Sequence, residues 1–202
     1  MNRRVAIVVL GAVLAGCAAG LPPSPLFVEV EPFEPPTRDT AQIVFLAPRA
    51  APTAANANAL YELHANQRTL LAALAGHTGS FQQVPPGHHV FMAVGRAAHL
   101  LEADVEGGAR YYVLLRPDAS GDLTPLPVRM SEDAEISNRS SESGQWLFDS
   151  TLVAKTAAAD AWFAAKASQV DAAQAAALAV WQRQSAAQHA AATLGKDDAV
   201  LR

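Results

Sequence analysis

The sequence predicts a mainly β fold, a small antiparallel β-sandwich, with a long α-helix toward the C-terminal end. Between residues 41 and 129, short runs of β-branched and aromatic residues alternate with proline and glycine turn signals, which is typical of consecutive strands. From about residue 150 to 192 proline and glycine are absent and alanine dominates, which favours a helix. A signal segment and a proline-rich tether precede the predicted sandwich.

Residues 1–16 have the pattern of an export signal. Arg3 and Arg4 precede an apolar run over residues 5–13, and small residues follow before the first cysteine. The run is about half of the roughly 20 residues that a membrane-spanning helix needs. Three prolines within residues 22–25 then stop any helix. We therefore expect a cleaved signal peptide over residues 1–16 and no transmembrane helix.

The sequence at the end of this signal, Leu14-Ala15-Gly16-Cys17, resembles the lipobox of bacterial lipoproteins. The resemblance implies diacylglyceryl transfer to the Cys17 thiol, signal-peptidase cleavage before Cys17 and acylation of the new amino terminus. A two- or three-chain anchor holds firmly, because each buried methylene contributes roughly 0.8 kcal/mol. In bacteria with two membranes, the same resemblance associates Ala18 after the cysteine with the outer membrane, facing the periplasm.

Cys17 is the only cysteine of the chain, so the exported protein forms no internal disulfide. Residues 17–38 then form a proline-rich segment, which predicts a stiff, extended tether. At roughly 3 Å per residue it reaches up to about 60 Å. Residues 27–31 alternate as a strand would, and docking of this strand on the domain is the alternative to a free tether.

Residues 39–130 are the predicted sandwich domain. We expect strands over residues 42–46, 88–94, 110–116 and 123–130. The alternation in residues 88–94 is that of a half-buried strand, and in residues 110–116 it places Tyr111 and Tyr112 on opposite faces. Two prolines in the last segment, Pro125 and Pro127, predict an edge strand or a bulge.

Residues 59–74 are rich in leucine and alanine, which by propensity favours a helix, yet Asn66-Gln67 can also be the turn of a hairpin. Three motifs occur within or after this segment, in stretches with a strand-like pattern. They are the Leu70-Leu71 pair, Pro86-Gly87-His88 and Gly108-Ala109-Arg110-Tyr111-Tyr112-Val113. In these motifs the chain resembles small bacterial lipoproteins with a prealbumin-like or PEGA-like β-sandwich. That resemblance implies the hairpin, and it implies no established activity.

A polar loop over residues 131–149 separates the sandwich from the alanine-rich helix, expected over residues 150–194. A polar tail over residues 195–202 follows. The larger apolar residues of the helix lie near one stripe, which can pack on the sandwich or pair with another helix, in a second copy or an envelope protein. They are Trp162, Phe163, Val170, Leu178 and Trp181.

The charge balance argues against nucleic acid as a partner. The chain has 15 basic and 19 acidic side chains; without Arg3 and Arg4, 13 basic side chains remain, a net charge of −6. Phosphate binding needs clustered lysine and arginine, and no such cluster occurs. A polybasic patch for anionic lipid is also lacking.

The motifs of common enzyme classes are missing from the sequence: it has no nucleophile elbow, zincin pair, phosphate loop or calcium loop. Adjacent His88 and His89 point to opposite faces of a strand, so they cannot bind one ion together. We expect neither a catalytic residue, a metal nor a cofactor. The sequence predicts a non-catalytic, lipid-anchored protein of the bacterial envelope, with a structural or interaction role. The alternative is a binding module for cell-wall glycan or a small ligand.

Overall fold

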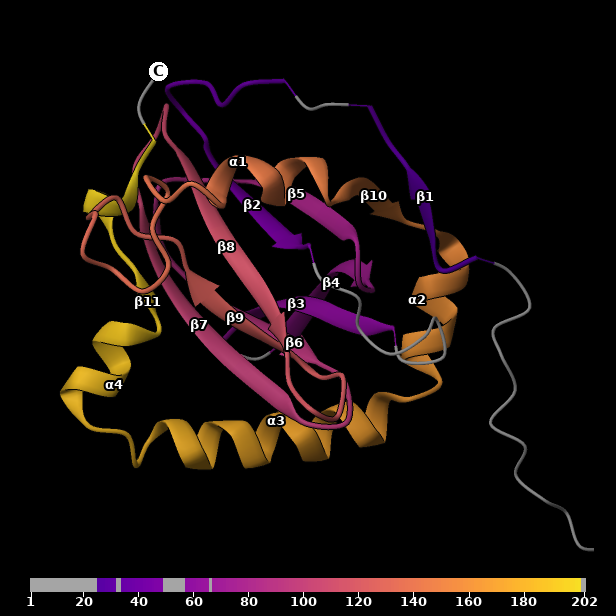
Figure 1. Ribbon diagram of the computed structural model, residues 1–202. Helices are drawn as coiled ribbons and strands as arrows, with labels where there is room; N and C mark the ends of the chain where they lie inside the picture. The colour runs from indigo at the N-terminus through magenta and orange to yellow at the C-terminus, as the bar shows by residue number, and fades with distance from the viewer. Residues whose placement is uncertain (1–24, 32–33, 49–56, 66, 201–202) are drawn as a thin grey trace, which may run out of the picture.

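The computed structural model describes residues 25–31, 34–48, 57–65 and 67–200. In this part of the chain two β-sheets pack face to face, and helices cover their outer faces (Figure 1). The prediction of a mainly β protein with a long helix near the C-terminus is confirmed.

The first sheet has six strands in the order β1-β10-β5-β2-β8-β9. Strand β2 lies at its centre, antiparallel to β5 and parallel to β8. The bounds are β1 Phe27–Glu29, β2 Ala41–Ala47, β5 Thr78–Val84, β8 Arg110–Pro117, β9 Leu123–Pro127 and β10 Thr151–Lys155.

The second sheet has five strands in the order β11-β7-β6-β3-β4. Its four longer strands form antiparallel neighbours, whereas the short β11 pairs in parallel with β7. The bounds are β3 Asn58–His64, β4 Gln67–Leu74, β6 Gly87–Val94, β7 Ala98–Val105 and β11 Thr193–Leu194.

The sandwich is therefore mixed, and the prediction of an antiparallel one is wrong in this respect. The chain leaves the six-stranded sheet after β2, returns for β5, leaves again for β6 and β7, and returns as β8 beside β2. Parallel neighbours need such long crossovers. Turn signals in a sequence reveal local hairpins only, so they could not indicate this pairing.

The core lies between the two sheets, where the alternate residues of each strand meet. Tyr111, Phe45 and Phe91 are fully buried there, and the Phe45 and Phe91 rings pack edge to face with centroids 5.3 Å apart. Asn58 connects the two layers, because its side chain accepts from the Leu123 backbone N–H at 3.0 Å and donates to the Gly121 carbonyl at 3.2 Å. A buried amide with both groups bonded costs little and fixes the alignment of the sheets.

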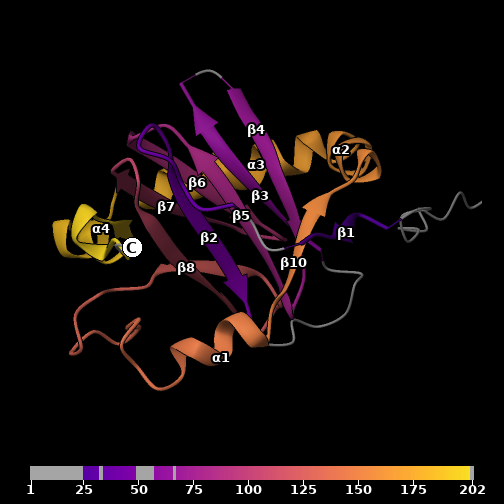
Figure 2. The same cartoon turned by 90° about the horizontal axis from the view of Figure 1, so that it is seen from above.

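Helices α2 (Ala157–Ala164) and α3 (Ala167–Trp181) cover the outer face of the five-stranded sheet (Figure 2). Buried residues of β3, β6 and β7 pack against Phe163, Val170 and Ala177 of these helices. Strand β6 is therefore buried on both faces along its second half. The half-buried pattern expected for it was wrong there, because alternation cannot show that a distant helix covers the second face.

The segment predicted as one helix over residues 150–194 is divided into several elements. It begins with β10 and continues through α2, α3, α4 (Ala186–Ala191) and β11. Helices α2 and α4 begin where a hydroxyl caps a backbone N–H: Thr156 accepts from Ala159, and Ser185 forms a capping box with Gln188. Helix α3 begins after Lys166 without a side-chain cap. The absence of proline and glycine indicated helical composition but did not show these capping residues as starting points.

Three further expectations can be compared with the structure. Residues 58–74 form the β3–β4 hairpin, which confirms the hairpin over the helix. Strand β1 pairs with β10, so this part of the predicted tether docks on the sandwich. Strand β9, which carries Pro125 and Pro127, is the edge strand that the prolines predicted.

Both predicted polar segments contain structure. The loop over residues 131–149 includes α1 (Ser143–Phe148), and residues 131–148 cover part of the outer face of β8 through Ile136 and Trp146. The tail includes a 3₁₀ turn over Lys196–Asp198, after which the Val200 N–H donates to the Arg110 carbonyl at 2.8 Å. The sandwich thus extends beyond residues 39–130, since β1, β10 and β11 complete its sheets.

Candidate ligand-binding groove

The residues predicted as the lipidation site, Cys17 with Leu14, Ala15 and Gly16, lie outside the described part of the chain. No helix in the described part is long and apolar enough to cross a membrane. The predicted site therefore remains a prediction from the sequence, and the described residues have to be searched for other sites.

The apolar stripe predicted on the C-terminal helix is partly confirmed. Phe163 and Val170 are buried against the five-stranded sheet, and Trp162 and Trp181 are half-buried beside them. Leu178 is 37% exposed and lies outside the buried contact, so its assignment to the stripe was wrong. Within α3, at about 100° per residue, Trp181 lies about 20° from Val170 around the helix axis, whereas Leu178 lies about 80° away, which explains the difference.

The histidines are paired with different groups in different places. His89 and His64 both approach Glu62, with N–O distances of 2.7 and 3.8 Å. His88 lies 3.0 Å from an Asp104 carboxylate oxygen, on the other face of the strand as expected. Within the described ranges, no group of three potential ligands from histidine, cysteine, aspartate and glutamate could hold a metal ion.

The two adjacent tyrosines have different surroundings. Tyr111 is fully buried, and its hydroxyl accepts from the Glu106 backbone N–H at 2.9 Å. Burial raises the pKa of the Tyr111 hydroxyl. Tyr112 is half-buried on the outer face with Trp146, and both line one hollow of about 280 Å³. Trp162 packs on the opposite outer layer of the molecule, so these rings do not form one stacking surface for a glycan.

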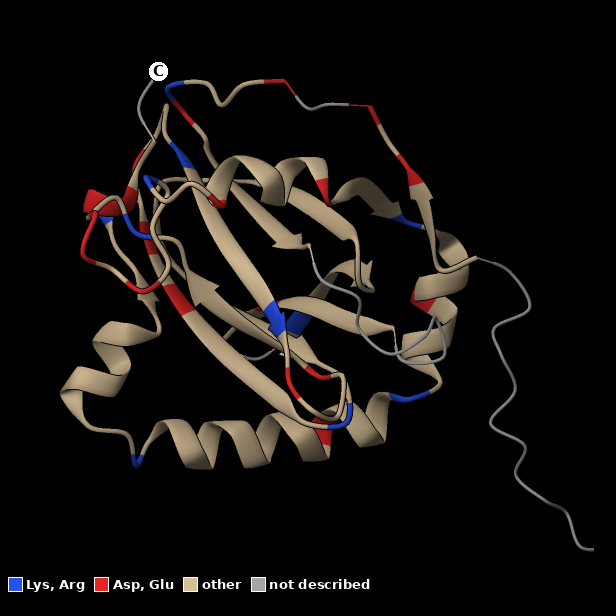
Figure 3. Ribbon diagram, viewed as in Figure 1, with Lys and Arg blue, Asp and Glu red and all other residues tan. Residues whose placement is uncertain are grey.

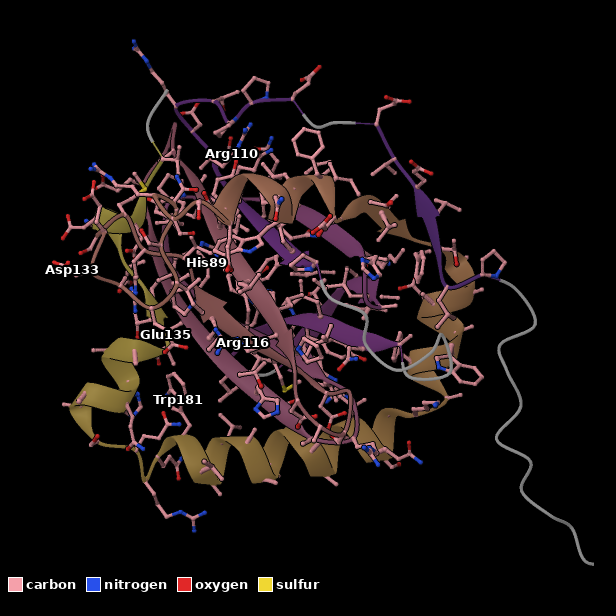
Figure 4. All side chains as sticks on the ribbon, viewed as in Figure 1. His89, Arg110, Arg116, Asp133, Glu135 and Trp181 are labelled. Carbon is pink, nitrogen blue, oxygen red and sulfur yellow. The ribbon has the colours of Figure 1, made fainter. Side chains whose placement is uncertain are left out.

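A larger hollow, which we name the α3 groove, lies between α3, the start of β7 and the edge strand β9. Its volume is about 490 Å³, within the usual range for small-molecule sites. Figure 4 shows Trp181 above the C-terminal part of α3, on the side that faces the sheet. The described lining residues are Arg96–Leu100, Thr124–Leu126, Ala173, Ala176, Ala177, Val180, Trp181, Gln184 and Ala192.

The groove results from the small residues of α3. Ala173, Ala176, Ala177 and Val180 follow one another at helical spacings of one to four residues and face one side. At the other end of α3, the larger Val170 and the neighbouring Phe163 of α2 are buried against the sheet, although they also border a second hollow of about 390 Å³. Alanine cannot fill the corresponding space, so a hollow stays open beside β7 and β9.

Trp181 and Ala192 bound one end of the groove. The Trp181 ring contacts the His189 ring of α4 edge to face, with centroids 4.5 Å apart. This contact ties α4 to the end of α3. The groove is therefore bounded by elements that pack on each other.

Two of the lining residues each have one buried polar atom for which the described residues supply no hydrogen bond. These atoms are Nε2 of His99, on β7, and Oε1 of Gln184, which follows α3. A buried polar atom without a partner costs about 1–3 kcal/mol. Because these two atoms have almost no accessible surface, they are not exposed to the open space of the groove.

The charged groups at the rim are mostly occupied by the turn that follows β6. Asp122 is buried, and its two oxygens accept from the backbone N–H groups of Arg96 and Ala97 at 2.8 and 2.9 Å. Hydrogen bonds from Ser120, side chain and backbone, lower the pKa of the exposed Asp118 carboxyl. Arg96 also donates from Nη2 to the Ser120 carbonyl at 2.6 Å.

Charged side chains are sparse along this side of the molecule. Helix α3 carries a single charged residue, Asp171, and α4 has none (Figure 3). Among the described lining residues Arg96 is the only fixed charge and none is acidic. The groove thus combines mainly apolar walls with one lining arginine, Arg96, which lies beside the acidic turn of Asp118 and Asp122.

Comparisons with known proteins do not extend this description. No family model matches the chain, and no curated protein matches it. A solved structure titled "NMR structure of the protein from Eubacterium rectale" is similar to half of the chain, with 13% identity, coverage of 95% of that protein and a TM-score of 0.29. A TM-score this low supports no argument about function.

Reasoning from the sequence missed the α3 groove. The available signal was the run of alanines beside Trp181, which indicated close packing and could equally have indicated unfilled space. The groove depends on β9 and α3 meeting beside β7, which lies beyond local sequence.

Proposed function

We propose that this protein is a non-catalytic lipoprotein of the bacterial cell envelope, anchored through acyl chains on Cys17. The observation that supports the proposal is the sequence Leu14-Ala15-Gly16-Cys17 after a basic and apolar signal segment. The folded domain then begins within about ten residues of the anchor, because β1 starts at Phe27. The sandwich is held close to the bilayer surface.

Labelling with radioactive palmitate and membrane fractionation test this proposal. The full chain should incorporate palmitate and sediment with membranes, whereas a Cys17→Ser variant should do neither. Ser24→Cys in the Cys17→Ser background is a matched control, because it restores a thiol outside the lipobox and should stay unlabelled. Equal labelling of wild type and Cys17→Ser would contradict the proposal.

The identity of the next residue sets the expected membrane. With Ala18, the protein of a two-membrane bacterium should be found in the outer membrane, facing the periplasm. Ala18→Asp should move it to the inner membrane without loss of palmitate. Density-gradient separation of the two membranes measures the shift, and an unchanged distribution would contradict outer-membrane sorting by this residue.

The domain is proposed to act by binding. An interaction with an envelope protein or with a second copy would use the exposed apolar residues of α3: Leu178, which is 37% exposed, and Val180 at the border of the α3 groove, which is 52% exposed. Such exposed apolar residues on a helix with one charge favour a contact surface. Mass measurement by light scattering tests self-association, and Val180→Lys should weaken it if a dimer forms.

A small-ligand binding module is the second candidate function. The specific observation in its favour is the α3 groove, with mainly apolar walls and the polar residues Arg96, His99 and Gln184 among those that line it. Sites for small molecules commonly combine apolar walls with a few polar groups that orient the ligand. Cell-wall glycan is less well supported, because the half-buried rings Tyr112 and Trp162 belong to opposite outer layers.

A further inference from the structure

We propose that α1 and the edge strand β1 contact the lipid bilayer through exposed apolar side chains, and that this contact orients the sandwich on the membrane. The surface is formed by Val28 of β1 and by Leu147 and Phe148 of α1, and we name it the α1 face. The inference rests on the first function proposed above, anchoring through Cys17, and adds a second point of attachment.

The α1 face contains three of the five large apolar side chains that are exposed in the described part of the chain. Phe148 is 93% exposed, and Leu147 and Val28 are 43% and 48% exposed. Single exposed leucines and valines are common, but an almost fully exposed phenylalanine next to an exposed leucine is typical of a contact surface.

Helix α1 presents these residues on the outer face of the six-stranded sheet. Trp146 packs there with Tyr112, which attaches the helix to the sheet. The next two residues, Leu147 and Phe148, stay exposed. The α1 face therefore consists of the part of the helix that the sandwich does not cover.

Val28 lies on the same outer face. Its neighbour Phe27 packs against the core, and alternation along β1 places Val28 on the opposite side of the strand. Its partner across the strand pair, Ala154, is also exposed. Helices α2 and α3 cover the other outer layer, and Figure 2 shows α1 and α3 on opposite sides of the sheets.

The chain from the proposed anchor ends at this layer. About ten residues separate Cys17 from β1, which span at most about 35 Å when fully extended. Strand β1 pairs with β10, and β10 follows α1 after Asp149 and Ser150. An anchored protein therefore keeps the α1 face close to the bilayer. Contact between the two is then intramolecular, so a few apolar side chains with weak affinity are sufficient.

The chemistry of α1 suits the boundary between lipid head groups and acyl chains. Ser143–Phe148 contains no charged residue, whereas Glu142 and Asp149 flank it (Figure 3). Aromatic and leucine side chains of surface helices are buried at this boundary. The flanking carboxylates disfavour attraction to anionic lipid, so the contact depends on apolar burial and a zwitterionic bilayer suffices.

Tryptophan fluorescence with brominated lipids tests the contact. The full chain, acylated at Cys17 in bacterial cells, is reconstituted into phosphatidylcholine vesicles with or without bromine on the acyl chains. Phe148→Trp keeps an aromatic ring on the α1 face. Its difference from wild type, which has three tryptophans, reports the added ring alone. We expect bromine to quench this difference at least twofold.

Leu178→Trp is the matched control, because Leu178 is also apolar and exposed but belongs to α3 in the opposite layer. Bromine should leave its added fluorescence unchanged. Adding Leu147→Ser to Phe148→Trp should reduce the quenching, because it removes half of the apolar surface that α1 presents. Thermal unfolding checks that every variant is folded.

Three results would overturn the inference. Equal quenching of the two reporters, or none of Phe148→Trp in acylated protein, would do so and leave anchoring at Cys17 in place. Emission of Phe148→Trp that shifts to the blue with protein concentration, without quenching, would identify a second copy on the α1 face. Absence of acyl chains by mass spectrometry would overturn the anchor and this contact together.

Discussion

Arg129 holds the C-terminal segment against the sandwich. Its guanidinium donates to the carbonyls of Ala190, Ala191 and Thr193 and to the Asp198 carboxylate, at 2.6–3.2 Å. The carbonyls at the end of a helix lack partners within it, so this side chain also caps α4. Its planar group of five donors matches several acceptors at once.

Arg129→Ala should lower the free energy of unfolding by about 2 kcal/mol, because it leaves a carboxylate and several carbonyls without their donor. Urea unfolding measures the change. Arg139→Ala is the matched control, because the Arg139 guanidinium forms an ion pair with the exposed Glu132. This substitution should lower the free energy of unfolding by less than about 0.5 kcal/mol. Equal effects of the two substitutions would contradict the role assigned to Arg129.

Gly95 occupies a position where a side chain does not fit. A Cβ there would lie 2.7 Å from Oδ1 of Asn58 and still closer to the Asp122 carboxylate. These are the groups that join the sheets and hold the turn after β6. The restriction is steric, and its origin is tertiary.

Gly95→Ala should therefore destabilise the protein by about 1–3 kcal/mol, since it displaces packed polar groups. Gly144→Ala should instead stabilise the protein by about 0.5–1 kcal/mol, because a Cβ at this position meets nothing within 4 Å and alanine favours the helical conformation of α1. Thermal unfolding of both variants provides the comparison. A stabilising Gly95→Ala would show that the Asn58–Asp122 contacts can shift freely.

At the scale of elements, α3 is attached to the sheet by one polar side chain in addition to its apolar contacts. Arg68 of β4 donates to Asp171 at 2.5 Å and to Gln174 at 3.0 Å, and its guanidinium lies 5.6 Å from the Tyr61 ring centroid. The attachment fixes the N-terminal half of α3. The C-terminal half, beside the α3 groove, depends on smaller contacts.

Arg68→Met should lower the free energy of unfolding by only about 1 kcal/mol, because Asp171 is largely exposed and water screens its ion pair with Arg68. Hydrogen exchange should accelerate in the first half of α3 in particular. Arg183→Met removes the same charge just beyond α3 and should leave the exchange unchanged. Uniform acceleration along the whole helix in both variants would contradict a local attachment by Arg68.

At the scale of the whole molecule, two buried tyrosines limit stability at alkaline pH. Burial is the main cause that raises the pKa of Tyr61 and Tyr111 above the ordinary value of 10.0. The folded state therefore holds these protons more tightly than the unfolded state. The resulting stability is present below pH 10 and is lost as pH rises through the raised folded values.

Circular dichroism together with tyrosine absorbance should show that unfolding and ionisation of these two side chains occur together. Tyr61→Phe with Tyr111→Phe should move the alkaline midpoint of unfolding upward. The loss of the hydrogen bond from Glu106 lowers stability at neutral pH in the same variant. Ionisation of both tyrosines without loss of the fold would contradict this account.

Some strands of the sandwich were predicted from the sequence, because they depend on local information, whereas β5 and β7 were not predicted and β10 and β11 fall in the segment expected to be a helix. Turn residues and alternation predicted β2, β6 and β8 with boundaries within one residue of those observed. They also predicted the start of β9, but this strand ends three residues earlier than expected. The prolines correctly identified β9 as an edge strand. The β3–β4 hairpin needed the family resemblance as well, since leucine and alanine there favour a helix.

The sequence by itself determined the mainly β class and the helical composition of the C-terminal third; it is also the basis of the proposed anchor at Cys17. Only the tertiary structure decided the parallel pairing of β2 with β8, the division of the C-terminal segment and the α3 groove. The physical reason is the distance along the chain over which each feature acts. Periodicity, helix caps and signal motifs depend on residues that are close in sequence. The groove needs β7, β9 and α3 to meet, and alanines leave space only opposite a particular partner.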